Sequence, residues 1–195
     1  MFFLIHNFFN VIMRYLIVVL ILGGLNASCT ADKKSKKIEP VIEDEKIDYN
    51  KDYDSTDSQT KVVFSQAKDQ QIFDLYLSIK KALVNSNEKE VQSQAKKLGA
   101  VIKDFDEDKQ LKAISKLIAL TKDIHKQRDF FVGLTHEIEK HINKVDITSG
   151  EIYQQFCPMV FEGKGGYWFS NSKEIRNPYF GKKMLTSGSV KKIFK

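Results

Sequence analysis

A thiol and a thioether stand two residues apart in this chain, on either side of a proline, at Cys157-Pro158-Met159. The proline fixes its own φ, and residues two apart in an extended segment point to the same side, so both sulfur atoms could face one ion. Sulfur ligands of this kind select soft metal ions, above all Cu(I). The alternative is structural, because free cysteine is commonly buried and methionine commonly fills gaps in a core.

Two further residues are candidates for the same site. Met184 is a third sulfur, for which a core methionine is the alternative. His141 falls on the apolar stripe of a predicted helix and could point toward the C-terminal segment, whereas a hydrogen-bonded core histidine is the usual explanation. His136 is five residues away from His141, on a different helical face, which argues against a pair of ligands on one helix. We interpret His136 and His125 as surface residues.

The segment that carries the sulfur atoms has an unusual composition. Residues 156–188 contain two of the three prolines, half of the glycines and the single tryptophan of the chain. Turn residues and aromatic rings together can hold ligands in a fixed loop geometry. Trp168, Tyr167, Tyr179 and Phe180 are expected to form the core of this segment, and Asn177 is expected to hold nearby backbone with its side chain.

The elements that must position this segment are helical. From Lys68 onward, apolar residues recur at helical spacing in four stretches, and Asn87 is placed to cap the second of them. The third stretch either continues or breaks near Lys126. The four stripes are Ile72, Leu75, Tyr76, Ile79 and Leu83; Val91, Ala95, Leu98, Ile102 and Phe105; Leu111, Ile114, Leu117, Ile118 and Ile124; and Phe131, Leu134, Ile138 and Ile142.

The helical pattern stops after Gly150. Residues 152–156 and 167–169 have strand composition, and the glycines of residues 163–166 could form the turn between them. The final lysines, Lys191, Lys192 and Lys195, are interpreted as a solvated tail, with contact to anionic lipid as the alternative. The fold class is therefore predicted as mainly α, an up-down bundle of about four helices with a small irregular β-containing C-terminal subdomain at about residues 150–195.

The N-terminus predicts export. From Met13, one arginine, an apolar core and small residues form a signal peptide (residues 1–28) that ends at Cys29, as in a bacterial lipoprotein. A transmembrane anchor is the alternative, and Met13 could be the true start. Residues 29–65 follow as the lipidated Cys29 and a charged tether of low apolar content, which predicts disorder, and residues 66–195 are the folded part.

Export and charge restrict the classes of function. With Cys29 lipidated, Cys157 is a lone thiol in an oxidising compartment, where a buried, metal-bound or intermolecularly paired state is expected. The net charge of +6 is spread over lysines with interspersed acids, which argues against nucleic-acid binding. A nucleophilic Cys157 aided by a histidine lacks any supporting local signature, so we predict that the chain is not an enzyme.

The C-terminal motifs together resemble a domain of unknown function in exported proteins of Bacteroidetes, which also ends CusB-type adaptor subunits of heavy-metal efflux pumps. The resemblance covers roughly residues 66–190. It is carried by Gln127-Arg128-Asp129-Phe130, Cys157-Pro158-Met159, Gly166-Tyr167-Trp168-Phe169-Ser170, Ile175-Arg176-Asn177-Pro178-Tyr179-Phe180-Gly181 and Met184-Leu185-Thr186-Ser187-Gly188.

The resemblance implies a periplasmic metal-handling module, with Cys157 and Met159 among its ligands. This chain departs from the pattern at Ser187, where the family usually has a second cysteine. We therefore expect a membrane-anchored lipoprotein on the periplasmic side that binds a soft metal ion, most simply Cu(I), for a heavy-metal efflux system. A CusB-type adaptor or another envelope protein is the expected partner. The alternative is an adaptor-like protein-interaction module without metal.

Overall fold

The computed structural model of the chain describes residues 51–102 and 108–195. The predicted signal peptide, Cys29 and most of the predicted tether lie outside these residues. In chain order the described elements are β1 (Val63–Phe64), α2 (Ala67–Val84), α3 (Glu88–Val101), α4 (Lys109–Leu120), α5 (Ile124–Ile142), β2 (Ile147–Ser149), β3 (Ile152–Cys157), β4 (Gly166–Ser170), the 3-10 helix η2 (Gly181–Met184) and β5 (Ser189–Phe194).

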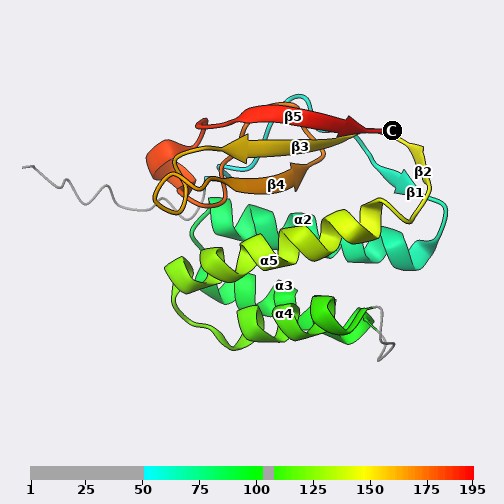
Figure 1. Cartoon of the computed structure of the whole chain (residues 1–195), viewed down its shortest axis with the longest axis horizontal. Coiled ribbons are helices and arrows are strands. Elements are labelled where there is room, and N and C mark those ends of the chain that lie inside the picture. The colour runs from blue at the N-terminus through cyan, green and yellow to red at the C-terminus, as the bar shows by residue number, and fades with distance from the viewer. Residues whose placement is uncertain (1–50, 103–107) are drawn as a thin grey trace, which may run out of the picture. The chain divides into compact units, whose positions relative to one another are not determined.

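The elements form three layers (Figure 1). A sheet of β4, β3 and β5 lies over α2 and α5, and α3 and α4 form the layer beyond them. Tyr76 of α2 joins the upper two layers, because its ring stacks on Phe131 of α5 at 5.2 Å and meets Phe169 of β4 edge-on at 6.2 Å. Its hydroxyl lies 2.9 Å from Thr135 Oγ1 and accepts the Phe169 N–H at 3.0 Å. The prediction of a helical bundle with a small β subdomain is confirmed.

Local capping sets the helix boundaries. The Asn87 side chain accepts the N–H of Glu90 at 3.1 Å at the start of α3, as predicted. The Asp123 side chain accepts the N–H of Lys126 at 2.8 Å, so a new helix begins at residue 124 and the third predicted stretch breaks there. Leu117 was expected to point inward but is 47% exposed, because α4 buries the face of Leu111 and Ile118 instead.

The sheet is antiparallel. β3 pairs with β4 from Tyr153 opposite Ser170 to Cys157 opposite Gly166, which confirms the predicted hairpin. The other side of β3 pairs with β5, where we had expected a solvated tail. Its lysines are exposed as expected, but the backbone of residues 189–194 is ordered by hydrogen bonds to β3, which composition alone does not reveal.

The folded domain begins earlier than the predicted boundary at residue 66. Residues 51–60, which we call the strap, run along the end of α2 and the loop after β4. Asp54 in the strap forms an ion pair with Lys80 of α2 at 2.5 Å, and the Lys80 side chain is only 2% exposed. Further along, the Thr60 N–H donates to the Asn171 carbonyl at 2.8 Å. A buried lysine on the apolar face of α2 needs a carboxylate, and the strap supplies it.

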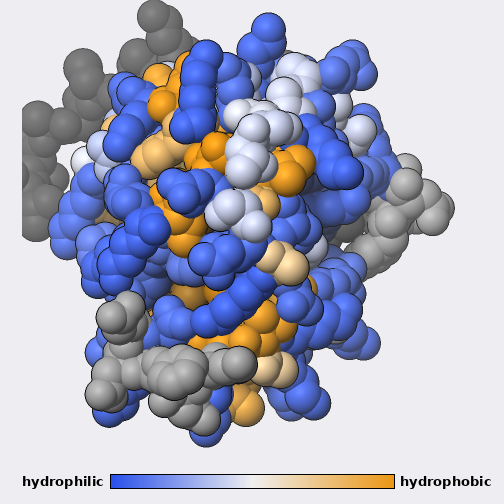
Figure 2. Space-filling view, turned by 90° about the vertical axis from the view of Figure 1, so that its right-hand side faces the viewer, coloured by the Kyte–Doolittle hydropathy of each residue, from blue (hydrophilic) through white to orange (hydrophobic). Residues whose placement is uncertain are grey.

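Figure 2 looks at the end of the domain where β1 and β2 lie, and in that view apolar residues show as narrow strips between hydrophilic ones. In the described part of the chain, no helix is both long enough and apolar enough to span a membrane.

The ion pair between Asp54 and Lys80 should dominate the stability of the strap. We expect Asp54→Ala to lower the free energy of unfolding by about 3–5 kcal/mol, because it leaves a buried ammonium group without a counter-charge. Urea denaturation followed by circular dichroism measures this loss. The matched control is Asp57→Ala, which removes an exposed carboxylate from the same strap. Equal stability of the two variants would contradict an anchoring role for the pair.

Candidate metal centre

The two sulfur-bearing motifs meet at one end of the domain. Cys157 is the last residue of β3, and Ser187 lies just before β5. The Cys157 Sγ is 3.3 Å from the Ser187 Oγ, within hydrogen-bond distance, and the cysteine is fully buried. We call this end of the molecule, formed by the last turn of α2, the first turn of α5, residues 157–165 and η2, the motif end.

Asn177 holds the motif end together. Its side-chain Nδ2 donates to the Ser187 carbonyl at 2.8 Å, and its Oδ1 accepts the N–H of Tyr179 at 2.8 Å and that of Phe180 at 3.3 Å. The Tyr179 hydroxyl in turn donates to the Tyr167 carbonyl at 2.5 Å. The expectation that Asn177 binds nearby backbone is confirmed, and the motif residues fix the loops on which Cys157 and Ser187 lie.

Two glycines of the motifs occupy positions that a side chain could not. Gly181 has a φ of +56°, and an added Cβ would lie 2.8 Å from the Val84 carbonyl oxygen. Gly188 has a φ of +143°, and a Cβ there would lie 2.8 Å from the Trp168 ring. Both the backbone conformation and the close approach require glycine.

Arg128 attaches α5 to the motif end. Its guanidinium donates from Nε to the Pro178 carbonyl at 2.9 Å, and from Nη2 to the Leu83 carbonyl and the Ser86 hydroxyl at 3.0 Å each. The side chain is buried, with 8% of the residue exposed, and burial lowers the pKa of the guanidinium to about 10. It therefore remains charged at neutral pH, and at the C-terminal end of α2 it is stabilised by the Leu83 carbonyl.

The predicted methionine ligands are both accessible. Met159 is 50% exposed and Met184 is 36% exposed. Met159 lines a surface pocket of about 270 Å³ at the motif end, together with His125 and Asp129 of α5. The other lining residues are Arg128, Val160, Phe161, Glu162, Tyr179 and Phe180.

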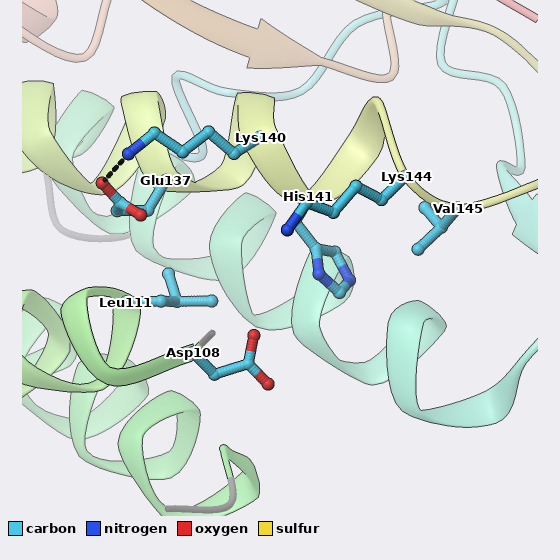
Figure 3. A pocket seen from close by; sticks show the side chains of 7 residues that line it. All are labelled: Asp108, Leu111, Glu137, Lys140, His141, Lys144 and Val145. Atoms are coloured by element: carbon cyan, nitrogen blue, oxygen red, sulfur yellow. Dashed lines mark hydrogen bonds and ion pairs between the residues drawn. The ribbon is translucent and has the colours of Figure 1, made fainter. Parts of the chain in front are cut away.

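His141 does not belong to this pocket. Its Nε2 lies 3.1 Å from Asp69 Oδ1 of α2, close enough for an ion pair but without hydrogen-bond geometry within the described residues. It lines a different pocket of about 220 Å³, where Asp108 faces it and Lys140 pairs with Glu137 (Figure 3). His141 thus points to α2 and α4 rather than toward the C-terminal subdomain.

The length of α5 separates the predicted ligands. His125 and His141 are sixteen residues apart on this helix, which corresponds to about 24 Å along its axis. Because His125 shares a pocket with Met159, His141 lies at the far end of the helix and cannot bind the same ion. The structure brings Cys157, Met159 and the segment of Met184 to the motif end and leaves His141 elsewhere. Residues 158 and 159 form a turn rather than the predicted extended segment, and Cys157 is buried while Met159 is half exposed, so the prediction that their spacing points both sulfur atoms to one side is wrong.

Sequence reasoning missed two features of the motif end. His125 and Asp129 are four residues apart, a spacing that places both on one helical face, and this spacing is visible in the sequence. Arg128 was noticed only as part of a resembling segment, and its burial has no local signal. Over residues 51–102 and 108–195, no three histidine, cysteine, aspartate or glutamate side chains gather closely enough to hold a metal ion by themselves.

Comparison with known proteins gives one match. The model of a family described as a protein of unknown function (DUF3347) matches residues 72–150. This region runs from α2 to just after β2, so it contains the four-helix layers and His125 but ends before Cys157. No curated protein and no solved structure matches the chain. The match covers the helices that position the motif end, and the sulfur motifs lie beyond it.

We expect Asn177→Ala to destabilise the domain by roughly 2–4 kcal/mol, because it leaves the buried N–H of Tyr179 and the carbonyl of Ser187 without partners. Asn177→Asp keeps the acceptor and loses the Nδ2 donor, so its stability should lie between that of wild type and Asn177→Ala. Chemical denaturation of the three proteins measures the order. An alanine variant as stable as wild type would show that these hydrogen bonds do not hold the loops.

Proposed function

We propose that this chain is an exported lipoprotein domain that binds a soft metal ion, Cu(I), at the motif end and exchanges it with a heavy-metal efflux system. One observation carries the proposal, namely the 3.3 Å contact between the Cys157 thiol and the Ser187 hydroxyl. This contact joins two motifs that are thirty residues apart in sequence, and Met159 and Met184 lie two and three residues from it. Thiolate and thioether donors are those that Cu(I) prefers.

The burial of Cys157 requires an entry route for the ion. The turn after β3 carries Phe161 at a φ of +53° and Glu162 at +57°, a left-handed conformation that costs about 1–2 kcal/mol for each non-glycine residue. Strained segments of this kind often belong to functional sites. A partial opening of residues 158–165 would release this strain and expose the thiol. Ligand exchange is then possible if the ligand set of the ion is incomplete. Donor atoms of a partner protein can in that case bind the ion before the ligands of this chain dissociate from it.

Cysteine and methionine substitutions test the site. Under anaerobic reducing conditions, the full chain in detergent should compete with a Cu(I) chelator and bind one ion. We expect Cys157→Ser to lose this tight binding and Met159→Leu to weaken it, since each removes a soft donor. Denaturation curves of the variants confirm that they are folded. If Cys157→Ser bound Cu(I) as tightly as wild type, the cysteine would not be a ligand.

Ser187→Cys offers a gain-of-function counterpart. The new thiol would replace a hydroxyl that already lies 3.3 Å from Cys157 Sγ, so we expect it to raise the Cu(I) affinity by at least about tenfold, and to lose that gain in the Cys157→Ser background. The same titration measures both variants. An affinity equal to that of wild type would place the ion away from this contact.

A second candidate function is an adaptor-like interaction module that needs no metal. It is favoured by the exposure of three large apolar side chains at this end of the domain, those of Tyr167, Met159 and Met184. The Cu(I) titration separates the two functions. Wild type that fails to compete with the chelator would favour docking of an envelope protein, and such docking should survive Cys157→Ser.

The lipoprotein part of the proposal rests on the sequence, because Cys29 lies outside the described residues. We expect Cys29→Ser to abolish incorporation of labelled palmitate and to release the chain from the membrane fraction of the cells that produce it. Loss of labelling with full membrane retention would instead favour the transmembrane anchor that the first 22 residues could form.

A further inference from the structure

The pocket at the motif end is lined by side chains of metal-binding types from two separate segments. His125 and Asp129 project from the first turns of α5, one helical turn apart. Met159 and Glu162 line the same pocket from the turn that follows β3. An imidazole, a thioether and two carboxylates therefore border one space of about 270 Å³.

These donors are accessible, in contrast to the thiol. His125, Asp129 and Glu162 are exposed, and half of Met159 is exposed, whereas Cys157 is fully buried. Exposed side chains change rotamer within nanoseconds, so they can close around an ion although they are not gathered beforehand. The pocket lies close to Cys157 along the chain, because Met159 and Val160 are two and three residues after the cysteine.

Carboxylates border this pocket together with the imidazole. Asp129 and Glu162 line it with His125, and the Asp123 side chain, two residues before His125, accepts the Lys126 N–H at 2.8 Å. Positive groups lie nearby as well, namely Arg128, Lys126 and the N-terminal end of the α5 dipole. Arg128 already donates to three acceptors outside the pocket-facing carboxylates.

The donor chemistry selects copper. Imidazole binds copper, zinc, iron and nickel, and thioether restricts the choice to soft ions such as Cu(I). We propose that His125 and Met159 are the outer ligands through which Cu(I) reaches the motif end. The inference rests on the proposed function and adds the place where the ion first binds and where a partner's ligands can reach it.

Two histidines of the same helix provide a matched test. His125→Ala removes a pocket-lining imidazole, and His136→Ala removes an exposed imidazole that lines neither of the two described pockets. In anaerobic chelator competition with the full chain, we expect His125→Ala to weaken Cu(I) binding by at least about tenfold, as loss of a ligand should. His136→Ala should bind as wild type does.

A second readout follows the outer ligands without the thiol. In Cys157→Ser protein labelled with methyl-¹³C methionine, Cu(I) should still shift the Met159 resonance, and His125→Ala in that background should abolish the shift. If His125→Ala binds Cu(I) as wild type does while Cys157→Ser loses it, the outer ligands are refuted and the metal-binding function stands. If wild type does not compete for Cu(I) at all, both proposals fail.

Discussion

The buried guanidinium of Arg128 is the interaction on which the motif end depends. It is a full positive charge with little access to water, so its N–H groups must find acceptors, and those acceptors belong to α2, to the turn before α3 and to the C-terminal loop at Pro178. The end of α2 with the turn that follows it, and the C-terminal loop at Pro178, are distant from each other in sequence and are thereby held against the start of α5. The position of His125 next to Met159 follows from this attachment, because His125 precedes Arg128 by less than one helical turn.

A second constraint acts inside the C-terminal segment. Asn177 satisfies backbone groups of its own loop and of the loop that carries Ser187, and in this way it brings Ser187 to Cys157. Much of the unusual composition of residues 156–188 has a structural purpose of this kind, since glycines permit close approach and aromatic rings fill the space around them. What the motifs leave for chemistry is a buried thiol and two accessible thioethers.

The sequence predicted the helices and the hairpin well because their signals are local. The cap at Asn87 acts over three residues, and the glycines of residues 163–166 form a turn between neighbouring strands. The sequence did not predict elements whose pairing partners lie far away along the chain. β5 is ordered by β3 more than thirty residues earlier, and the strap is ordered by Lys80 and Asn171, so neither shows the apolar periodicity that local analysis needs.

The sequence by itself determined the fold class, the helical stretches with the cap at Asn87, and the donor atoms that a soft ion could use. Only the tertiary structure decided which donors share a site. It separated His141 from the sulfur motifs by the length of α5, placed His125 beside Met159 and buried Cys157 against Ser187. The physical reason is that capping and periodicity depend on neighbours along the chain, whereas burial, ion pairing and shared pockets depend on packing between segments far apart in it.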